Sequence, residues 1–317
     1  MSLSLDLDNK WSYLRTYGNE AWQQFPSYLN LVIPRILDFF AARNIKITFF
    51  IVGQDAALDE NREAISRLSA AGHDIGNHSF KHEPWLHTYS EEELNRDLQM
   101  AEEAIKEVTG VRVNGFRGPG YSITETTLRV LKMRGYKYDA TAFPNILNPL
   151  SRAYLFATSK LSREEKRRRK ALFGSFSDAF RPVKPYRWNL GQESLLELPV
   201  TTMPVFKTPI HFSYLTYLGT FSRILAKTYL RFAISMCDLT GTEPSLLLHP
   251  LDFMGKEDDS DLSSFPGMGL LLARKLDLMD TYFEMLLKSF TPVTVGEHVE
   301  IIMARQAPRS FQPTFSN

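Results

Sequence analysis

The sequence contains a single cysteine, Cys237, among 317 residues. One thiol cannot form an internal disulfide, and it cannot build a cysteine-rich zinc site. Uninterrupted apolar runs long enough to cross a bilayer, about 18 residues or more, are also missing. We therefore predict neither a disulfide-stapled domain nor a transmembrane span. Because 44% of the residues are hydrophobic, we expect a sizeable core of the ordinary globular kind.

An excess of charge of either sign is absent as well, since 37 Lys and Arg residues stand against 36 Asp and Glu residues. A chain so balanced has no general attraction for nucleic acid or for an acidic surface. The basic run REEKRRRK at 163–170 is a local exception. We interpret it as a solvated helix, because no stacking aromatic residues interleave it. We expect no nucleic-acid partner, and the sequence leaves the oligomeric state open.

The N-terminal stretch MSLSLDLDNKW lacks the features of a secretory signal peptide. It has neither a basic beginning nor an apolar segment, and carboxylates stand at positions 6 and 8. The single cysteine also fits a reducing compartment. We expect a cytoplasmic protein, with a peripheral position at the membrane as an open alternative.

Strand-like and helix-like segments alternate along most of the chain. The strands are indicated by LSLDLD, IKITFFIVG, HDIGN, VRVNGF, YKYDAT, LLELPVTT and SLLLHP, with amphipathic stretches between them. The clearest helix begins at Ser90, which forms a capping box with Glu93, and ends at Gly110. Such alternation predicts a mainly parallel α/β sheet, and seven or eight strand–helix units favour an incomplete barrel over an open sheet.

Two regions depart from this alternation. Residues 150–190 look like an insertion, so we expect one domain over residues 1–317 with an insertion at about 150–190. Residues 211–236 are rich in aromatic and aliphatic side chains with scattered basic ones. We predict a buried barrel helix there, and the alternative is a helix that lies at a membrane surface.

Carboxylates and imidazoles lie near the ends of the predicted strands, where the catalytic residues of such barrels are found. Asp6 and Asp8 lie two residues apart, so they share one face of the first strand. His78 and His82 would share one face of a helix. Two histidines and one aspartate can hold Zn²⁺ and leave its fourth position to water. Either motif alone is weak, because solvated carboxylates and exposed histidines are common.

Two further motifs carry polar groups to the same place. FRGPGYS follows a predicted strand, and its Arg117 could balance the second carboxylate of the Asp6–Asp8 pair. Gly118, Pro119 and Gly120 predict a stiff turn that brings backbone N–H groups close to a ligand. LLLHP ends a late buried strand with His249, either at the site or as a simple strand-end residue.

Together these motifs resemble the polysaccharide deacetylase (NodB-homology) family of carbohydrate esterases. LDLD, HSFKH, FRGPGY, YDAT and LLLHP occur in that order within residues 3–143 and 195–252. The resemblance implies a distorted, incomplete (β/α)7 barrel and a metal-dependent hydrolase that removes an acetyl or formyl group from an amino sugar or glycan. The commonest first motif of the family has adjacent aspartates, whereas Leu7 intervenes here. The chain therefore looks like an Asp-x-Asp subgroup, in which the division of labour between Asp6 and Asp8 is less certain.

The resemblance also implies which residues bind the metal and act on water. Asp8, His78 and His82 would bind a divalent cation, Zn²⁺ first, with Co²⁺ or Mn²⁺ as alternatives. Asp6 would be the general base, and Arg117 would keep it ionised and oriented.

Other matching residues would serve the leaving group and the substrate. His249 would be the general acid, with Asp139 fixing its tautomer. The backbone N–H of Tyr121 would donate to the oxyanion, and Pro119 and Gly120 would border the substrate. Trp85 and Trp188 are candidate walls of the acyl pocket, although a core role is equally open for each. We interpret His211 as an ordinary loop residue.

Three other interpretations remain open. The chain also resembles allantoinase-like cyclic-amide hydrolases, which belong to the same superfamily, and a catalytically silent carbohydrate-binding relative is a third possibility. The aromatic stretch and the basic run additionally suggest a lipid-linked sugar, because deformylases of lipid-linked aminosugars look similar in outline. Metal content and release of acetate or formate from amino sugars would separate these interpretations.

Overall fold

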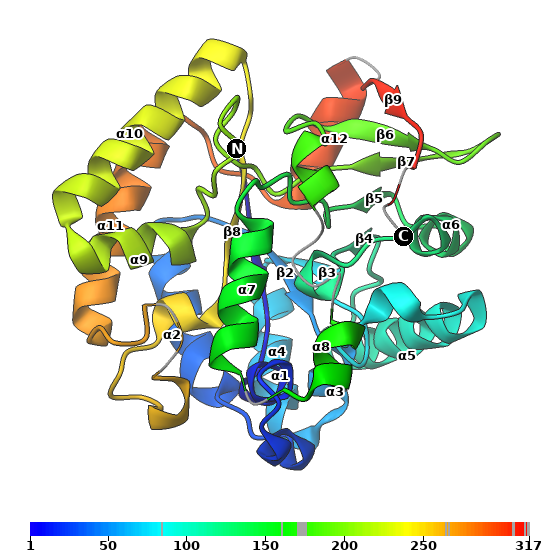
Figure 1. Ribbon diagram of the computed structural model, residues 1–317, viewed down its shortest axis with the longest axis horizontal. Coiled ribbons are helices and arrows are strands. Elements are labelled where there is room, and N and C mark those ends of the chain that lie inside the picture. Colours follow the sequence, from blue (N-terminus) through cyan, green and yellow to red (C-terminus); the bar gives the residue numbers. More distant parts are fainter. Residues whose placement is uncertain are drawn as a thin grey trace.

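The computed structural model describes residues 1–83, 85–159, 161–169, 176–263, 265, 267–305, 308–313 and 315. Within these ranges the strands form one sheet (Figure 1): β1 (Ser2–Asp6), β2 (Thr48–Ile51), β3 (Asp74–Asn77), β4 (Gly115–Phe116), β5 (Tyr138–Asp139), β6 (Tyr186–Asn189), β7 (Ser194–Glu197), β8 (Ser245–Leu248) and β9 (Ser310–Phe311). The α-helices are α1 (Lys10–Thr16), α2 (Leu29–Ala41), α3 (Gly53–Ala57), α4 (Asp59–Ala70), α5 (Glu91–Thr109), α6 (Glu125–Met133), α7 (Asn148–Thr158), α8 (Arg163–Arg168), α9 (Phe212–Phe221), α10 (Arg223–Thr240), α11 (Leu272–Leu287) and α12 (Val295–Arg305).

The strand order is β8-β1-β2-β3-β4-β5-β7-β6-β9, and the seven strands from β8 to β7 are all parallel. β6 then turns back antiparallel to β7. The two ends of the parallel sheet approach each other beyond β7, where the Thr201 N–H donates to Ser245 O at 2.9 Å. The expected fold is confirmed: a distorted, incomplete barrel of seven parallel strands.

Side chains of β1 point alternately to the outer side of the sheet, toward the helices, and to the inner side of the barrel. Leu3 and Leu5 pack outward among the helices, whereas the Ser4 hydroxyl and the Asp6 carboxylate meet Arg117 on the inner side. A smaller inner cluster joins the sheet to α12, and it comprises Phe50, Tyr138, Ala140, Leu196, Leu198, Val295 and Val299. α12 packs near the beginning of β1, because the Ser2 hydroxyl bonds to His298 Nδ1 at 2.9 Å. The opposite end of the barrel, where the strands finish, is left for the site.

Most of the strands and helices expected from the sequence are present, with two kinds of difference. The VRVNGF segment pairs as a strand only at Gly115–Phe116. Gly115 is required there, because a Cβ atom would stand 2.0 Å from Tyr138 Cζ on the next strand. The capping box at Ser90 and Glu93 and the left-handed Gly110 that ends α5 are confirmed. β6, β9 and the short α1 were not expected.

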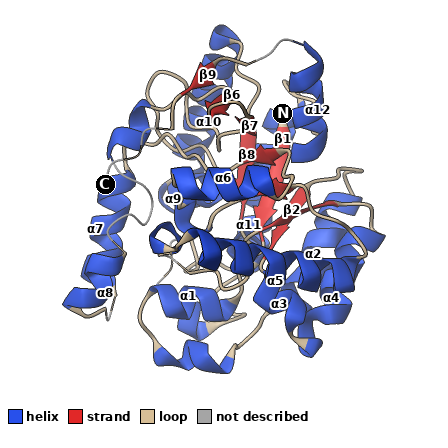
Figure 2. Cartoon of the chain, turned by 90° about the vertical axis from the view of Figure 1, so that its right-hand side faces the viewer, coloured by secondary structure: helices blue, strands red, loops and turns tan. Residues whose placement is uncertain are grey.

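The two irregular regions form helices (Figure 2). The region 150–190 contributes α7, α8 and β6, while residues 160 and 170–175 lie outside the described ranges. The aromatic stretch is divided into α9 and α10 at Ser222, which has an extended backbone. The Ser222 hydroxyl caps α10 by accepting the Leu225 N–H. Each helix has a buried side and an exposed apolar side, as Ala226 and Phe232 of α10 illustrate. Among the described residues, no helix combines the length and apolar composition that crossing a bilayer requires.

Candidate active site

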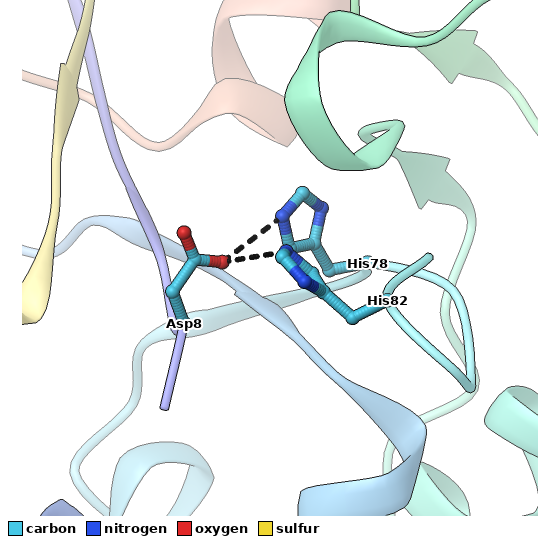
Figure 3. A group of neighbouring side chains, drawn as sticks. All are labelled: Asp8, His78 and His82. Carbon is cyan, nitrogen blue, oxygen red and sulfur yellow. Dashed lines mark ion pairs between the residues drawn. The ribbon is translucent and has the colours of Figure 1, made fainter. Parts of the chain in front are cut away.

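Asp8, His78 and His82 converge at the ends of β1 and β3 (Figure 3). Asp8 Oδ1 lies 2.9 Å from His82 Nε2 and 3.3 Å from His78 Nε2. One potential ligand atom from each residue lies within 4.8 Å of the others. The two imidazoles and the carboxylate that the sequence placed in one metal site therefore do meet in space.

The segment that carries the histidines is a loop and not the helix that their spacing suggested. Ser79 and His82 both adopt positive φ, at 62° and 48°. The loop is anchored by Asp97 of α5, whose buried carboxylate accepts the N–H groups of Phe80 and Lys81 at 2.8 and 3.1 Å. Asp97 was not identified from the sequence, because its residue type and helical position match an ordinary solvated carboxylate.

Asp8 is held by a separate set of bonds. The Tyr28 hydroxyl donates to the backbone carbonyl of Asp8. The next residue, Asn9, donates to the fully buried Asp55 at 2.7 Å, and Trp11 Nε1 donates to the same oxygen at 2.8 Å. These contacts fix the chain where β1 passes into α1, so the Asp8 side chain is directed toward β3.

The cluster suits a divalent metal ion. Asp8 Oδ1 and His82 Nε2 are buried and have no hydrogen-bond partner outside the cluster, as the ligand atoms of a shared cation would be. His78 Nδ1 contacts the Arg117 carbonyl at 2.6 Å, so it carries the proton and leaves the Nε2 lone pair free. Two imidazoles with one carboxylate form a donor set for Zn²⁺ that leaves a coordination position open.

The electrostatics of Asp8 and His82 agree with this assignment. Burial alone would raise the pKa of Asp8, but His82 and His78 together hold it below its ordinary value. Burial lowers the pKa of His82 despite the nearby Asp8. Asp8 is thus an anion and His82 a neutral imidazole at neutral pH, and these are the protonation states in which both bind metals.

Asp6 and Arg117 form a buried ion pair next to the cluster. Arg117 NH1 lies 3.1 Å from Asp6 Oδ1, and NH2 lies 3.2 Å from the Ser4 hydroxyl. The guanidinium is fully buried and lies over the Phe50 ring at 4.6 Å. Asp6 Oδ2 is 4.0 Å from His78 Nε2, so the free oxygen of the ion pair faces the metal cluster.

His249 lies at the end of β8, but its carboxylate partner is Asp252 and not Asp139. Asp252 accepts the backbone N–H of His249 at 2.8 Å. Ser213 links the two side chains, because its hydroxyl lies 3.2 Å from both His249 Nδ1 and Asp252 Oδ2. Asp252 stands three residues after His249, a spacing typical of a capped turn that the sequence could have suggested.

Asp139 instead supports the Gly-Pro-Gly turn. It accepts the Thr141 hydroxyl, and that oxygen in turn accepts the Gly118 N–H at 2.8 Å. On its other side Asp139 faces Glu197 of β7, its neighbour in the sheet. Burial raises the pKa of both carboxyl groups, and the negative charge of Asp139 adds to the rise at Glu197. Burial and mutual repulsion thus favour a proton on this pair of neighbouring carboxyl groups.

The Tyr121 N–H is already engaged. It donates to the Gly118 carbonyl at 3.2 Å within the turn Pro119–Tyr121. The Tyr121 ring stacks on Phe143, with the centroids 4.5 Å apart. An oxyanion would have to share the Tyr121 N–H with the Gly118 carbonyl, and the Tyr121 side of the turn lines the cavity.

A cavity of about 540 Å³ joins these groups. Its polar end is formed by Asp6, Asp8, His78, His82, His249 and Asp252, with Pro119, Gly120 and Tyr121 beside them. The rest of the lining is mainly apolar and lies on α1, α7, α9 and the loops near them. We call it the apolar arm, and it comprises Tyr13, Tyr17, Phe143, Leu147, Leu150, Tyr154, Leu155, Tyr214, Tyr217 and Phe265. The cavity therefore combines a few polar, reactive groups with a larger apolar lining.

Neither candidate tryptophan lines this cavity. Trp188 is buried in the core, where its indole N–H donates to Glu197 at 2.7 Å. Trp85 lies between the guanidinium groups of Arg15 and Arg169, at 5.3 and 4.9 Å. His211, which we took for a loop residue, does line the cavity: it is buried beside His249, with the ring centroids 5.9 Å apart. Burial and the nearby His249 keep its pKa well below the ordinary value, so it is a neutral imidazole.

Comparison with known proteins identifies the central part of this architecture. Residues 19–138 match the model of the family described as Polysaccharide deacetylase. A peptidoglycan deacetylase from Helicobacter pylori is 27% identical over 157 residues, which cover 47% of this chain and 51% of that protein. The peptidoglycan-N-acetylmuramic acid deacetylase PdaA from Bacillus subtilis is 32% identical over 111 residues, with 35% and 41% covered. The match thus spans about half the length of these relatives or less.

The similarity in fold to known structures covers more of the chain than the matched segment does. A crystal structure of a Mycobacterium smegmatis protein assigned as a polysaccharide deacetylase superposes on 100% of this chain and 94% of its own, with a TM-score of 0.64 and 21% identity. The family match includes His78, His82 and Arg117, while Asp6, Asp8 and His249 come to the same site from outside it. Residues 19–138 thus match the polysaccharide deacetylase family, and the whole chain shares the fold of a structure assigned to that activity.

Proposed function

We propose that this chain is a metal-dependent hydrolase that removes an N-acyl group, acetyl or formyl, from an amino sugar or glycan. The observation that carries the proposal is the position of the Asp8–His78–His82 cluster beside the Asp6–Arg117 pair and opposite His249, within one cavity. The names of the peptidoglycan deacetylases that match the chain support the same reaction class. We further propose that residues 1–317 work as one catalytic unit, since the site draws on both ends of the chain.

The residues around the cluster suit hydrolysis of an amide. A divalent cation at Asp8, His78 and His82, most simply Zn²⁺ and alternatively Co²⁺ or Mn²⁺, would polarise the acyl carbonyl and make water more acidic. Asp6 takes the proton of the attacking water, because its free oxygen faces the cluster while Arg117 holds the other one.

His249 is the proposed general acid. It lies in the same cavity, where it can donate a proton to the departing amine. Ser213 and Asp252 orient the ring through Nδ1, so Nε2 is the nitrogen available to the leaving group. Pro119 and Gly120 border the acyl end, and the neutral His211 stands behind His249.

The first test of the reaction class is a release assay on amino sugars. Metal-loaded protein is incubated with N-acetyl and N-formyl amino sugars, free and lipid-linked, and the released acetate or formate is measured. We expect one acyl product, lost after chelation of the metal and restored by Zn²⁺, Co²⁺ or Mn²⁺. Hydrolysis of allantoin-like cyclic amides by metal-free protein would favour the cyclic-amide alternative, and sugar binding without turnover in metal-replete protein would favour a silent relative.

A His249→Ala variant tests the general acid. We expect kcat to fall by about 10²–10⁴-fold with the metal content unchanged, because only proton delivery is lost. The defect should shrink on an acyl substrate whose leaving group departs without a proton, such as a nitrophenyl ester. Ser213→Ala is the matched control: it keeps the imidazole and loses only the oriented hydroxyl, so its loss should be smaller. If His249→Ala hydrolyses the amino sugar at a near-normal rate, His249 is not the general acid.

The finer identity of the substrate is proposed from the apolar arm. An isolated amino sugar needs hydroxyl-binding groups, whereas the apolar arm presents mainly aromatic and aliphatic side chains. We propose that the natural substrate is a lipid-linked amino sugar whose apolar portion occupies this arm. The comparison of free and lipid-linked sugars in the release assay tests this point separately from the reaction itself.

A further inference from the structure

Large apolar side chains are exposed around the mouth of the cavity. Leu150 and Tyr154 of α7 and Tyr217 of α9 line the cavity and are also exposed to solvent. α7 runs beside α9 (Figure 1), and the two are joined by a hydrogen bond between the Ser151 and Tyr214 hydroxyls at 2.9 Å. The rim of the cavity is thus itself apolar, which is unusual where a hydrophilic sugar alone must enter.

The apolar rim continues over neighbouring segments. The Tyr217 ring contacts Phe221, with centroids 5.1 Å apart, and Phe221 is followed across the break at Ser222 by Ile224 and Leu225. On the other side, the Ile146 N–H donates to the Lys207 carbonyl, and the Phe206 ring contacts Phe232. We call this set the rim surface: Ile146, Leu150, Tyr154, Val205, Phe206, Tyr217, Phe221, Ile224, Leu225 and Phe232.

The rim surface is a concentration of apolar residues and not a random scatter. It contains ten of the twenty large apolar side chains that are exposed among the described residues. Phe221 and Ile224 are 68% and 78% exposed, so they contribute little to the core. A concentration of exposed apolar side chains of this kind marks a surface that is covered by something else in function.

The charge of the segments that carry the rim surface indicates what covers it. Residues 140–163 and 198–237 contain no Asp or Glu, although the whole chain is almost neutral. Residues 198–237 contain Lys207, Arg223, Lys227 and Arg231. Arg223 pairs with Asp277 of α11, whereas Lys227 and Arg231 form no ion pair among the described residues. An apolar surface with unpaired cations at its border is complementary to an anionic lipid surface.

A second copy of this chain fits the same surface less well. A twofold interface would set the same basic segments against each other, and like charges facing across an interface are unfavourable. It would also cover the side of the cavity where Leu150, Tyr154 and Tyr217 of the rim surface line it. A membrane leaves the cavity open to molecules that lie in the bilayer.

We propose that the rim surface seats the protein on an anionic bilayer, with the cavity mouth against the lipid. This inference deepens the proposed function, because the apolar arm then opens to the layer that holds the lipid portion of the substrate. α9 and the first turns of α10 lie in the interface, with Phe221 and Ile224 among the acyl chains and Lys227 and Arg231 at the phosphate level. The protein lies on the membrane and does not cross it.

The test is flotation of the full chain with vesicles, and it needs no turnover. Vesicles of equal parts phosphatidylcholine and phosphatidylglycerol are compared with vesicles of phosphatidylcholine alone, each at low and high salt. We expect the protein to float with the anionic vesicles and to be released by high salt. Exchanging Lys227 and Arg231 for Glu should weaken binding by about fivefold or more per residue.

Matched variants distinguish membrane binding by the rim surface from nonspecific adsorption of the protein to vesicles. Phe221→Glu with Ile224→Glu should weaken anionic vesicle binding by at least about tenfold per residue, because each removes one buried apolar group and adds a repelled charge. Met133→Glu is the control, since Met133 of α6 is 62% exposed and lies outside the rim surface. It should bind like the unmodified chain. Neither Phe221 nor Ile224 lines the cavity, so hydrolysis of a soluble amino sugar should be unchanged in the double variant.

Several outcomes would overturn the proposal. The unmodified chain could stay in solution with both kinds of vesicle, or Met133→Glu could lose binding as fully as the double variant. A dimer that Phe221→Glu dissociates, seen by sedimentation in the absence of lipid, would assign the rim surface to a second copy. If the protein binds vesicles but releases no acyl group in the assay, the proposed reaction alone is rejected. If it releases an acyl group but does not bind vesicles, the proposed membrane binding by the rim surface alone is rejected.

Discussion

Replacing His78 by alanine is expected to abolish both metal binding and turnover. His78 Nε2 faces Asp8 Oδ1 at 3.3 Å, while its Nδ1 is tied to the Arg117 carbonyl, so one side chain supplies a ligand and also joins β3 to β4. Loss of a residue that only orients a ligand costs about 10–100-fold in metal affinity or activity, and loss of the ligand itself should exceed that range. Metal content by mass spectrometry and acyl release measure the two effects on the same sample.

The control for this experiment is His87→Ala. His87 lies in the short helical turn Leu86–Thr88 and does not line the cavity, so its removal should leave the metal content and turnover unchanged. Circular dichroism on both variants shows whether the barrel is intact. A His78→Ala protein that binds metal at the unmodified stoichiometry would mean that the cation binds elsewhere.

Asp6→Asn should produce the second large effect, and it should leave the metal in place. The amide keeps the shape of the side chain but cannot accept the proton of water, so kcat should fall by about 10²–10⁴-fold. KM should change little, because Asp6 lies behind the reacting groups and has only 4% of its surface exposed. Steady-state kinetics on a metal-loaded sample separate the two constants.

Ser4→Ala is the matched variant for Asp6→Asn. Ser4 is the other side-chain partner of the Arg117 guanidinium, at 3.2 Å, and it carries no charge. If Asp6 acts as the base, Ser4→Ala should keep most of the activity, whereas a purely structural role of the Arg117 contacts would make the two variants similar. Asp6→Asn with unimpaired kcat would transfer the role of base to another group, Asp8 included.

The fold and the convergence of Asp8, His78 and His82 could be predicted because both depend on local patterns. Strand alternation gave the parallel order of elements, and the barrel then brings residues at strand ends together. Asp6, His78, Arg117 and His249 all follow this rule. A polar residue at the end of a buried strand therefore helps to locate the site, even when its residue type alone is weak evidence for a function.

The local geometry of the site could not be predicted in the same way. The spacing of His78 and His82 is equally compatible with a helix, and the choice depends on Asp97, which receives the loop N–H groups from a different element. The partner of His249 was misassigned for a related reason. Asp139 and Asp252 are both buried carboxylates near strand ends, and only their side-chain directions separate them.

The cavity walls were the least predictable part. Trp188 and His211 lie on segments whose faces depend on pairing that the sequence does not reveal. β6 turns Trp188 into the core because it pairs antiparallel to β7. His211 precedes α9, and its ring points to His249 only because α9 packs beside β8. Long-range contacts of this kind determine whether a ring such as that of Trp188 or His211 lines the cavity or lies in the core.

The most direct measurement of the central claim is the position of the bound metal. A crystal of the protein loaded with Zn²⁺ and examined by anomalous diffraction should show one strong peak between Asp8, His78 and His82, at about 2.0–2.2 Å from an oxygen and two Nε2 atoms. A main peak at any other group of residues, with these three side chains making no contact to it, would contradict the account.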